Sequence, residues 1–60
     1  MSKPAFIIEL KKNSTAQEAL NQIFEKRYDL ALKDYTGLKL AIGISYDSKN
    51  KKHDILIKVF

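Results

Sequence analysis

Hydrophobic and polar residues alternate near the start of the chain. Side chains at every second position of a strand lie on the same face, so a strand over residues 5–12 has one apolar face and one that turns charged halfway along. The first face carries Phe6, Ile8 and Leu10, and the second carries Ile7, Glu9 and Lys11. The alternation therefore predicts a strand over residues 5–12, with Glu9 and Lys11 side by side.

A helical pattern follows a short polar turn. Ser14 with Gln17 and Thr15 with Glu18 both have the spacing of a capping box, which predicts a helix that begins near Thr15 or Ala16. Apolar residues then recur at helical spacing as far as about Lys33, namely at Ala16, Ala19, Leu20, Ile23, Phe24, Leu30 and Ala31. Arg27 lies inside this stripe, and we expect its stem to cover the core, with ligand binding as the alternative. Gly37 is suited to turn the chain after the helix.

The second half of the chain predicts a hairpin of two strands. In residues 38–46 one face carries large side chains and the other carries Lys39, Ala41, Gly43 and Ser45. A face of small residues indicates either close packing of another element or open space for a ligand. The polar residues 47–53 predict a hairpin loop, and residues 54–60 predict a last strand that is apolar on both faces.

These elements have the order β-α-β-β, which predicts an α/β fold with a three-stranded mixed sheet and one helix packed on one face. The first two strands should be parallel neighbours through a crossover, and the third should pair antiparallel with the second. One helix covers only one side of the sheet. The other apolar side therefore needs cover from a second copy or from a larger domain.

Composition narrows the class of protein. The 60 residues, 45% of them apolar and 30% charged, suit one folded domain over residues 1–60. The chain has no cysteine, so it can form neither a disulfide nor a thiolate-metal site, and its single histidine, His53, cannot build a zinc site alone. The first residues, Met1 to Pro4, do not resemble a signal peptide, and no apolar run is long enough to span a membrane. We expect a cytoplasmic protein without membrane contact.

The net charge of +4 favours a polyanionic partner such as nucleic acid, although small domains are often this basic for solubility alone. Three of the lysines, Lys49, Lys51 and Lys52, gather in the predicted hairpin loop.

Glu9 and Lys11 are the candidate chemical pair. Their spacing along a strand is about 6.6 Å, and we expect them on the sheet face opposite the helix. A carboxylate is a suitable ligand for Mg²⁺, and a neighbouring ammonium can steady the charge that grows on a phosphoryl oxygen. The alternative is a solvated ion pair at a strand end.

Three separated segments then agree in order and spacing with a known family. The apolar strand Ala5 to Lys11 ends in Glu-x-Lys, a helix carries Glu-Ala-Leu-Asn-Gln-Ile over residues 18–23 with Lys-Arg-Tyr at 26–28, and a strand Leu-Ala-Ile-Gly-Ile-Ser follows at 40–45. This arrangement resembles the PD-(D/E)xK nuclease superfamily, with its restriction-endonuclease-like fold. The resemblance is closest to the C-terminal nuclease-like domain of bacterial proteins that begin with an ATPase-like domain.

The resemblance implies a role for each matching residue. Glu9 would be the metal-binding carboxylate, Lys11 the catalytic lysine and Gln22 the helix glutamine that borders the active site, with Mg²⁺ as cofactor and nucleic acid as substrate. From its helical position alone, Gln22 lies just off the apolar stripe, and an exposed helix glutamine is then the simpler interpretation. Tyr28 also matches, but a tyrosine that covers the helix edge is the simpler interpretation. The family's aspartate, which comes from a preceding strand, has no counterpart here. We therefore expect a partial nuclease-like domain that is inactive or weak alone.

The same partial core predicts self-association. The free edge of the strand over residues 5–12 and the bare sheet face are both suited to a homodimer, by edge pairing or by face stacking. Two other functions stay open. One is a small interaction module without chemistry, and the other is a basic nucleic-acid-binding module in which Lys49, Lys51 and Lys52 contact phosphates.

Overall fold

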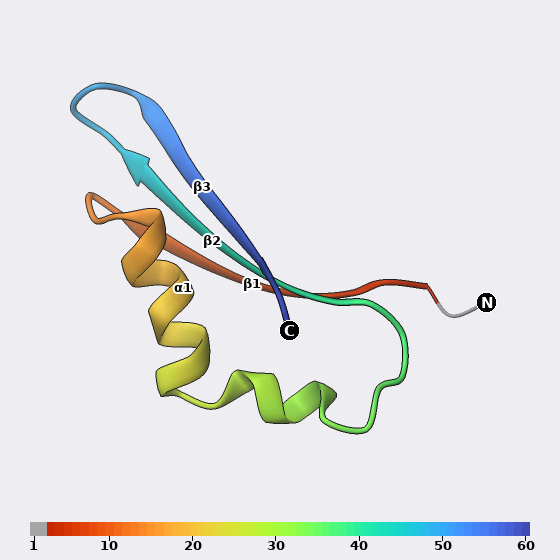
Figure 1. Ribbon diagram of the computed structural model, residues 1–60. Helices are drawn as coiled ribbons and strands as arrows, with labels where there is room; N and C mark the ends of the chain where they lie inside the picture. Colours follow the sequence, from red (N-terminus) through yellow and green to blue (C-terminus); the bar gives the residue numbers. More distant parts are fainter. Residues whose placement is uncertain (1–2) are drawn as a thin grey trace.

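The computed structural model describes residues 3–60, except for the side chain of Asp29, so Met1 and Ser2 lie outside it. Figure 1 shows the elements, which are β1 (Ala5–Lys12), α1 (Ala16–Glu25), the short 3₁₀ helix η1 (Tyr28–Leu32), β2 (Lys39–Asp47) and β3 (Lys52–Val59). α1 packs on one side of a three-stranded mixed sheet. The predicted α/β architecture is confirmed.

The sheet has the strand order β1-β2-β3. β1 runs parallel to β2, with Phe6 opposite Leu40, and β2 runs antiparallel to β3, with Leu40 opposite Val59. Both predicted pairings are therefore confirmed. The long crossover from β1 to β2 contains both helices, while β2 and β3 are joined by a tight turn.

The core lies between α1 and the small-residue side of β2. Its buried apolar members are Ala16, Ala19, Leu20, Ile23 and Ala41. A Cβ atom added to Gly43 would lie 2.4 Å from the carbonyl oxygen of Ala16 and 2.5 Å from the backbone nitrogen of Leu20, so the helix backbone crosses directly over this glycine. Of the two interpretations of the small-residue face, close packing is the one observed.

The start of α1 is fixed from two directions. Thr15 is the N-cap, and its hydroxyl accepts a hydrogen bond from the Glu18 backbone N–H at 3.0 Å. The Ser14 hydroxyl donates to the Glu18 carboxylate. From β3, the Asp54 carboxylate accepts from the Ala16 backbone N–H at 3.0 Å and so ties the last strand to the first turn of the helix.

The end of α1 differs from the prediction. The helix ends at Glu25 and not near Lys33, because Arg27 adopts a left-handed backbone conformation with φ 58°. The chain then continues as η1, in which Leu30 and Ala31 are exposed and take no part in an apolar stripe. Arg27 is exposed as well, and it lies between α1 and η1, so it is not part of the helical stripe in which the sequence placed it. Gly37 lies beyond η1, in the connection to β2, and does not end α1.

The hairpin turn is built around Asp47. Its carboxylate accepts hydrogen bonds from the backbone N–H groups of Lys49 and Asn50 and from the Asn50 side-chain amide at 2.8 Å. These bonds, the one from the Asn50 side chain above all, hold the pKa of Asp47 below its ordinary value. The turn is shorter than predicted, and β3 begins at Lys52.

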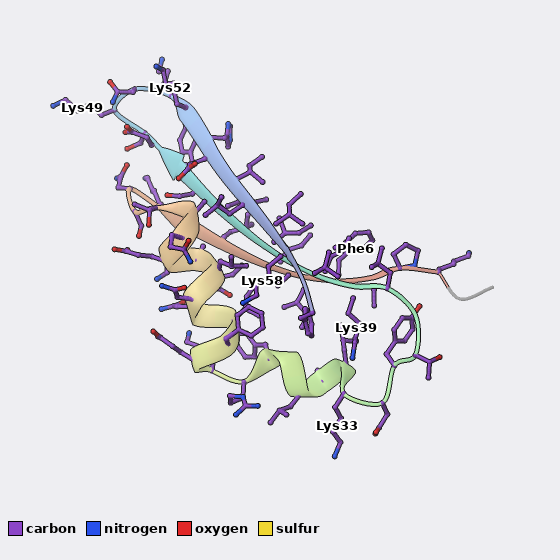
Figure 2. All side chains as sticks on the ribbon, viewed as in Figure 1. Phe6, Lys33, Lys39, Lys49, Lys52 and Lys58 are labelled. Carbon is purple, nitrogen blue, oxygen red and sulfur yellow. The ribbon has the colours of Figure 1, made fainter. Side chains whose placement is uncertain are left out.

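The side of the sheet away from α1 is bare, and we call it the open face. It consists of three rows of apolar side chains, one from each strand per row: Phe6, Leu40 and Val59; Ile8, Ile42 and Ile57; Leu10, Ile44 and Ile55. Figure 2 shows Phe6 on this side of the sheet and Lys39 on the helix side. The uncovered apolar side predicted from the sequence is thus present.

Candidate active site

Glu9 and Lys11 lie on the helix side of the sheet. Both are half-buried, together with Ile7, whereas Phe6, Ile8 and Leu10 are exposed on the open face. The prediction that the pair lies opposite the helix is therefore wrong. The reason is the size of the side chains on β2: only the face of Ala41, Gly43 and Ser45 lets a helix approach closely, and Glu9 shares that face as the neighbour of Gly43.

Gln22 from α1 joins the two charged side chains. Its amide lies 3.0 Å from the Glu9 Oε1 atom at one end and 3.0 Å from the Lys11 Nζ atom at the other. A carboxylate can only accept and an ammonium can only donate, so the amide NH₂ donates to Glu9 and the amide oxygen accepts from Lys11. All three residues predicted from the sequence thus meet at one point between β1 and α1.

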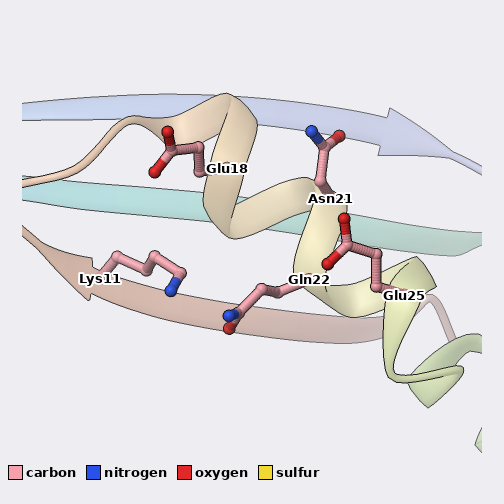
Figure 3. A pocket seen from close by; sticks show the side chains of 5 residues that line it. All are labelled: Lys11, Glu18, Asn21, Gln22 and Glu25. Atoms are coloured by element: carbon pink, nitrogen blue, oxygen red, sulfur yellow. The ribbon is translucent and has the colours of Figure 1, made fainter.

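A pocket of about 220 Å³ opens beside this trio. Figure 3 shows its lining, in which Lys11 of β1 reaches toward Gln22 and three further residues of α1 complete the wall: Glu18, Asn21 and Glu25. Glu9 does not line the pocket, but it accepts a hydrogen bond from Gln22, which does. The volume is below that of pockets for drug-sized ligands and suits a hydrated ion or a phosphate group.

Sequence reasoning missed the three additional lining residues. A signal was present, because Glu18, Asn21, Gln22 and Glu25 have the spacing i, i+3, i+4, i+7 and so form a polar stripe next to the apolar one. The stripe becomes informative only once α1 is known to pack over β1. Its polar side then faces Lys11 across the pocket.

The charge around the pocket is opposite in sign to that of the chain. Glu18, Glu25 and Glu9 supply three carboxylates against the one ammonium of Lys11, a local balance of about −2 in a chain of net charge +4. Such a pocket attracts cations.

The fit to a magnesium ion is partial. Glu9 and the Gln22 amide are oxygen donors of the kind that Mg²⁺ accepts. Within residues 3–60, however, no three side chains of the types His, Cys, Asp and Glu converge closely enough to hold a metal ion. The described residues thus supply at most part of a metal shell.

The remaining sequence candidates lie away from the trio. Tyr28 is 43% exposed, with the Lys26 ammonium 5.9 Å from its ring centre, as expected for a tyrosine at the helix edge. Lys49, Lys51 and Lys52 lie in or next to the exposed hairpin turn. The turn is held to the end of β1, because Asn13 accepts hydrogen bonds from the backbone and the hydroxyl of Ser48. The lysines are therefore at the same end of the sheet as Lys11.

None of the helices over residues 3–60 is long and apolar enough to cross a bilayer. The longest, α1, has ten residues, about half the length that a membrane span requires.

Comparison with known proteins assigns the chain to no family. No family model, no curated protein and no solved structure matches this chain.

Proposed function

We propose that this chain supplies part of a Mg²⁺-dependent phosphodiester-cleaving site of the PD-(D/E)xK type. The observation that carries the proposal is the convergence of Glu9, Lys11 and Gln22 beneath α1. Apolar side chains would fill the space under a helix at lower cost, because polar groups lose hydration when they are half-buried. A polar trio in this place is therefore better explained by chemistry than by packing.

Each residue of the trio has a distinct role. Glu9 would hold the metal through a carboxylate oxygen, and Mg²⁺, when bound there, would supply activation of a water molecule and neutralisation of phosphate charge. Lys11 steadies negative charge on the phosphoryl oxygens. Gln22 holds both side chains in place through its two hydrogen bonds. With one carboxylate of the motif in place, affinity for Mg²⁺ is low and the isolated chain is inactive or weak.

A metal titration followed by NMR tests this proposal. Mg²⁺ should shift the backbone amide of Glu9 and the side-chain amide signals of Gln22, and Mn²⁺ should broaden the same signals. Glu9→Gln removes the charge but keeps the shape, so we expect its affinity for Mg²⁺ to fall at least tenfold.

Two variants serve as controls. Asp34→Asn makes the same carboxylate-to-amide change at an exposed position outside the pocket and should leave the titration unchanged. Glu25→Gln lowers the negative charge of the pocket without touching the trio and should weaken binding only slightly. Absence of any shift in the natural chain, or equal shifts in Glu9→Gln, would point instead to an interaction module in which the trio is only structural.

A second candidate function is nucleic-acid binding without cleavage. It is favoured by the position of Lys49, Lys51 and Lys52 at the end of the sheet that also carries Lys11 and Lys12. Phosphate groups attract such a cluster whatever the base sequence. The same lysines would serve a nuclease by holding the substrate strand, so both candidates have nucleic acid as partner.

Two expectations complete the proposal. Self-association, through the free edge of β1 or through the open face, is the form in which we expect the chain to act. A cytoplasmic setting stays a prediction from the sequence.

A further inference from the structure

The described chain is a thin layer. Its Cα atoms span 41 × 23 × 11 Å, and their radius of gyration is 12.4 Å, whereas about 10.4 Å is typical of a compact domain of this length. The exposed surface of 4505 Å² exceeds the roughly 4000 Å² expected for a monomer of this mass. The molecule therefore has about 500 Å² more surface than a compact fold would show.

Much of this additional accessible surface belongs to the open face. Six of its nine side chains keep more than half of their surface accessible, and they come from the two outer strands: Phe6, Ile8, Leu10, Ile55, Ile57 and Val59. Half-exposed side chains of this size leave roughly 100 Å² each, so the six offer about 600 Å² and β2 adds more. A standard interface buries about 800 Å² per partner, and the accessible area of this face approaches that value.

The charges on the open face are confined to one end. The three apolar rows contain none, and the next row consists of Lys12, Tyr46 and His53, with the rings of Tyr46 and His53 4.9 Å apart. A uniformly apolar centre is complementary to a copy of itself. Because Lys12 lies at only one end, two copies avoid mutual repulsion when their strands run in opposite directions.

We infer that a second copy of this chain covers the open face, sheet against sheet, around a two-fold axis perpendicular to the strands and centred on the row of Ile8, Ile42 and Ile57. Packed sheets lie about 10 Å apart, and their inner side chains interdigitate. α1 and the pocket then lie on the outside of both copies, and each Lys12 meets the Phe6 end of its partner. The inference narrows the proposed self-association to one surface and one orientation, and it does not rest on the metal site.

Leu10→Glu, with Leu30→Glu as matched control, tests the surface. Leu10 is 71% exposed in the single chain, so its substitution leaves the core intact, while in the dimer it would bury two glutamates. Leu30 of η1 is 48% exposed and lies outside the open face. By sedimentation velocity we expect a dimer for the natural chain and for Leu30→Glu, and at least a hundredfold rise in the dissociation constant for Leu10→Glu.

The outcomes distinguish self-association in general from self-association through the open face. A natural chain that stays monomeric at every concentration overturns self-association and this inference together. A dimer that persists unchanged in Leu10→Glu overturns the open face alone and points to pairing through the edge of β1. If Leu10→Glu unfolds when dilute while Leu30→Glu stays folded, as circular dichroism would show, folding depends on cover for the open face and the inference is supported.

A spin label tests the orientation independently of any destabilising substitution. The chain has no cysteine, so Lys52→Cys places one label at the exposed hairpin end. Strands in opposite directions put the two labels roughly 30 Å or more apart, and strands in the same direction put them within about 20 Å. A distance in the shorter range, measured by pulsed electron resonance, would refute the two-fold arrangement.

Discussion

Gly43 is the residue that sets the distance between α1 and the sheet. The added methyl group of Gly43→Ala would meet backbone atoms of Ala16 and Leu20 within 2.5 Å, and helix backbone cannot move aside as a side chain can. We expect the free energy of unfolding to fall by about 2–3 kcal/mol, the upper part of the range for overpacked cores. Urea unfolding followed by circular dichroism measures the change.

Gly37→Ala is the control for this prediction. Gly37 lies in the connection between η1 and β2, and no described glycine has a positive φ, so alanine fits its backbone. Its substitution should change the free energy of unfolding by less than about 0.5 kcal/mol. Equal stability of Gly43→Ala and the natural chain would mean that α1 does not rest on β2 as described.

Alternation alone could show that Glu9 and Lys11 share a face, but not which face. The spacing of two residues fixes two sets of side chains on β1, and the larger apolar set, with Phe6, suggested the side that a helix would cover. The side of the sheet that α1 covers is determined by β2, where Gly43 lets the helix backbone approach. Gln22, placed next to the apolar stripe by its helical position, could be predicted as a boundary residue and is found as one.

Among the elements, the strands could be predicted well and the end of the helix could not. Period-two alternation is a direct consequence of strand geometry, and the bounds of β1 match the predicted residues 5–12. The apolar spacing through Leu30 and Ala31 continues past the true end of α1. The helix ends because Arg27 adopts a left-handed conformation. Glycine is the residue that usually takes this conformation, so an arginine gives no sign of it in the sequence.

Asp54 is the contact through which β3 holds α1. Its carboxylate accepts from the Ala16 N–H at the positive end of the helix dipole, so both the hydrogen bond and the charge stabilise the helix start. We expect Asp54→Ala to lower the free energy of unfolding by about 1–2 kcal/mol and Asp54→Asn to lower it by less. Thermal unfolding measures both. Asp34→Ala, at an exposed position, should have no effect; equal losses for Asp34→Ala and Asp54→Ala would rule out the helix contact.

At the scale of the whole molecule, charge is unevenly distributed along the sheet. Figure 2 shows Lys49 and Lys52 at the hairpin end and Lys33, Lys39 and Lys58 toward the opposite end. The lysines at the opposite end are partly engaged with rings, with the Lys39 Nζ atom 5.7 Å from the Phe60 ring centre and the Lys58 Nζ atom 5.2 Å from that of Phe24. The hairpin lysines are exposed and lie at the same end of the sheet as Lys11, so they are the better phosphate ligands.

Salt dependence tests this distribution. Each lysine–phosphate contact contributes about −0.9 to the slope of log affinity against log salt concentration, so replacing Lys49, Lys51 and Lys52 together by glutamine should reduce the slope by up to about 2.7. Fluorescence anisotropy with a labelled DNA duplex, between about 50 and 200 mM salt, gives the slope. Replacing Lys3, Lys26 and Lys33 by glutamine removes the same charge from exposed positions outside the hairpin, and it should lower affinity less and leave the slope nearly unchanged. The two triple variants have the same net charge. Equal slopes would therefore mean that nucleic acid responds only to total charge and that the hairpin is not a specific binding surface.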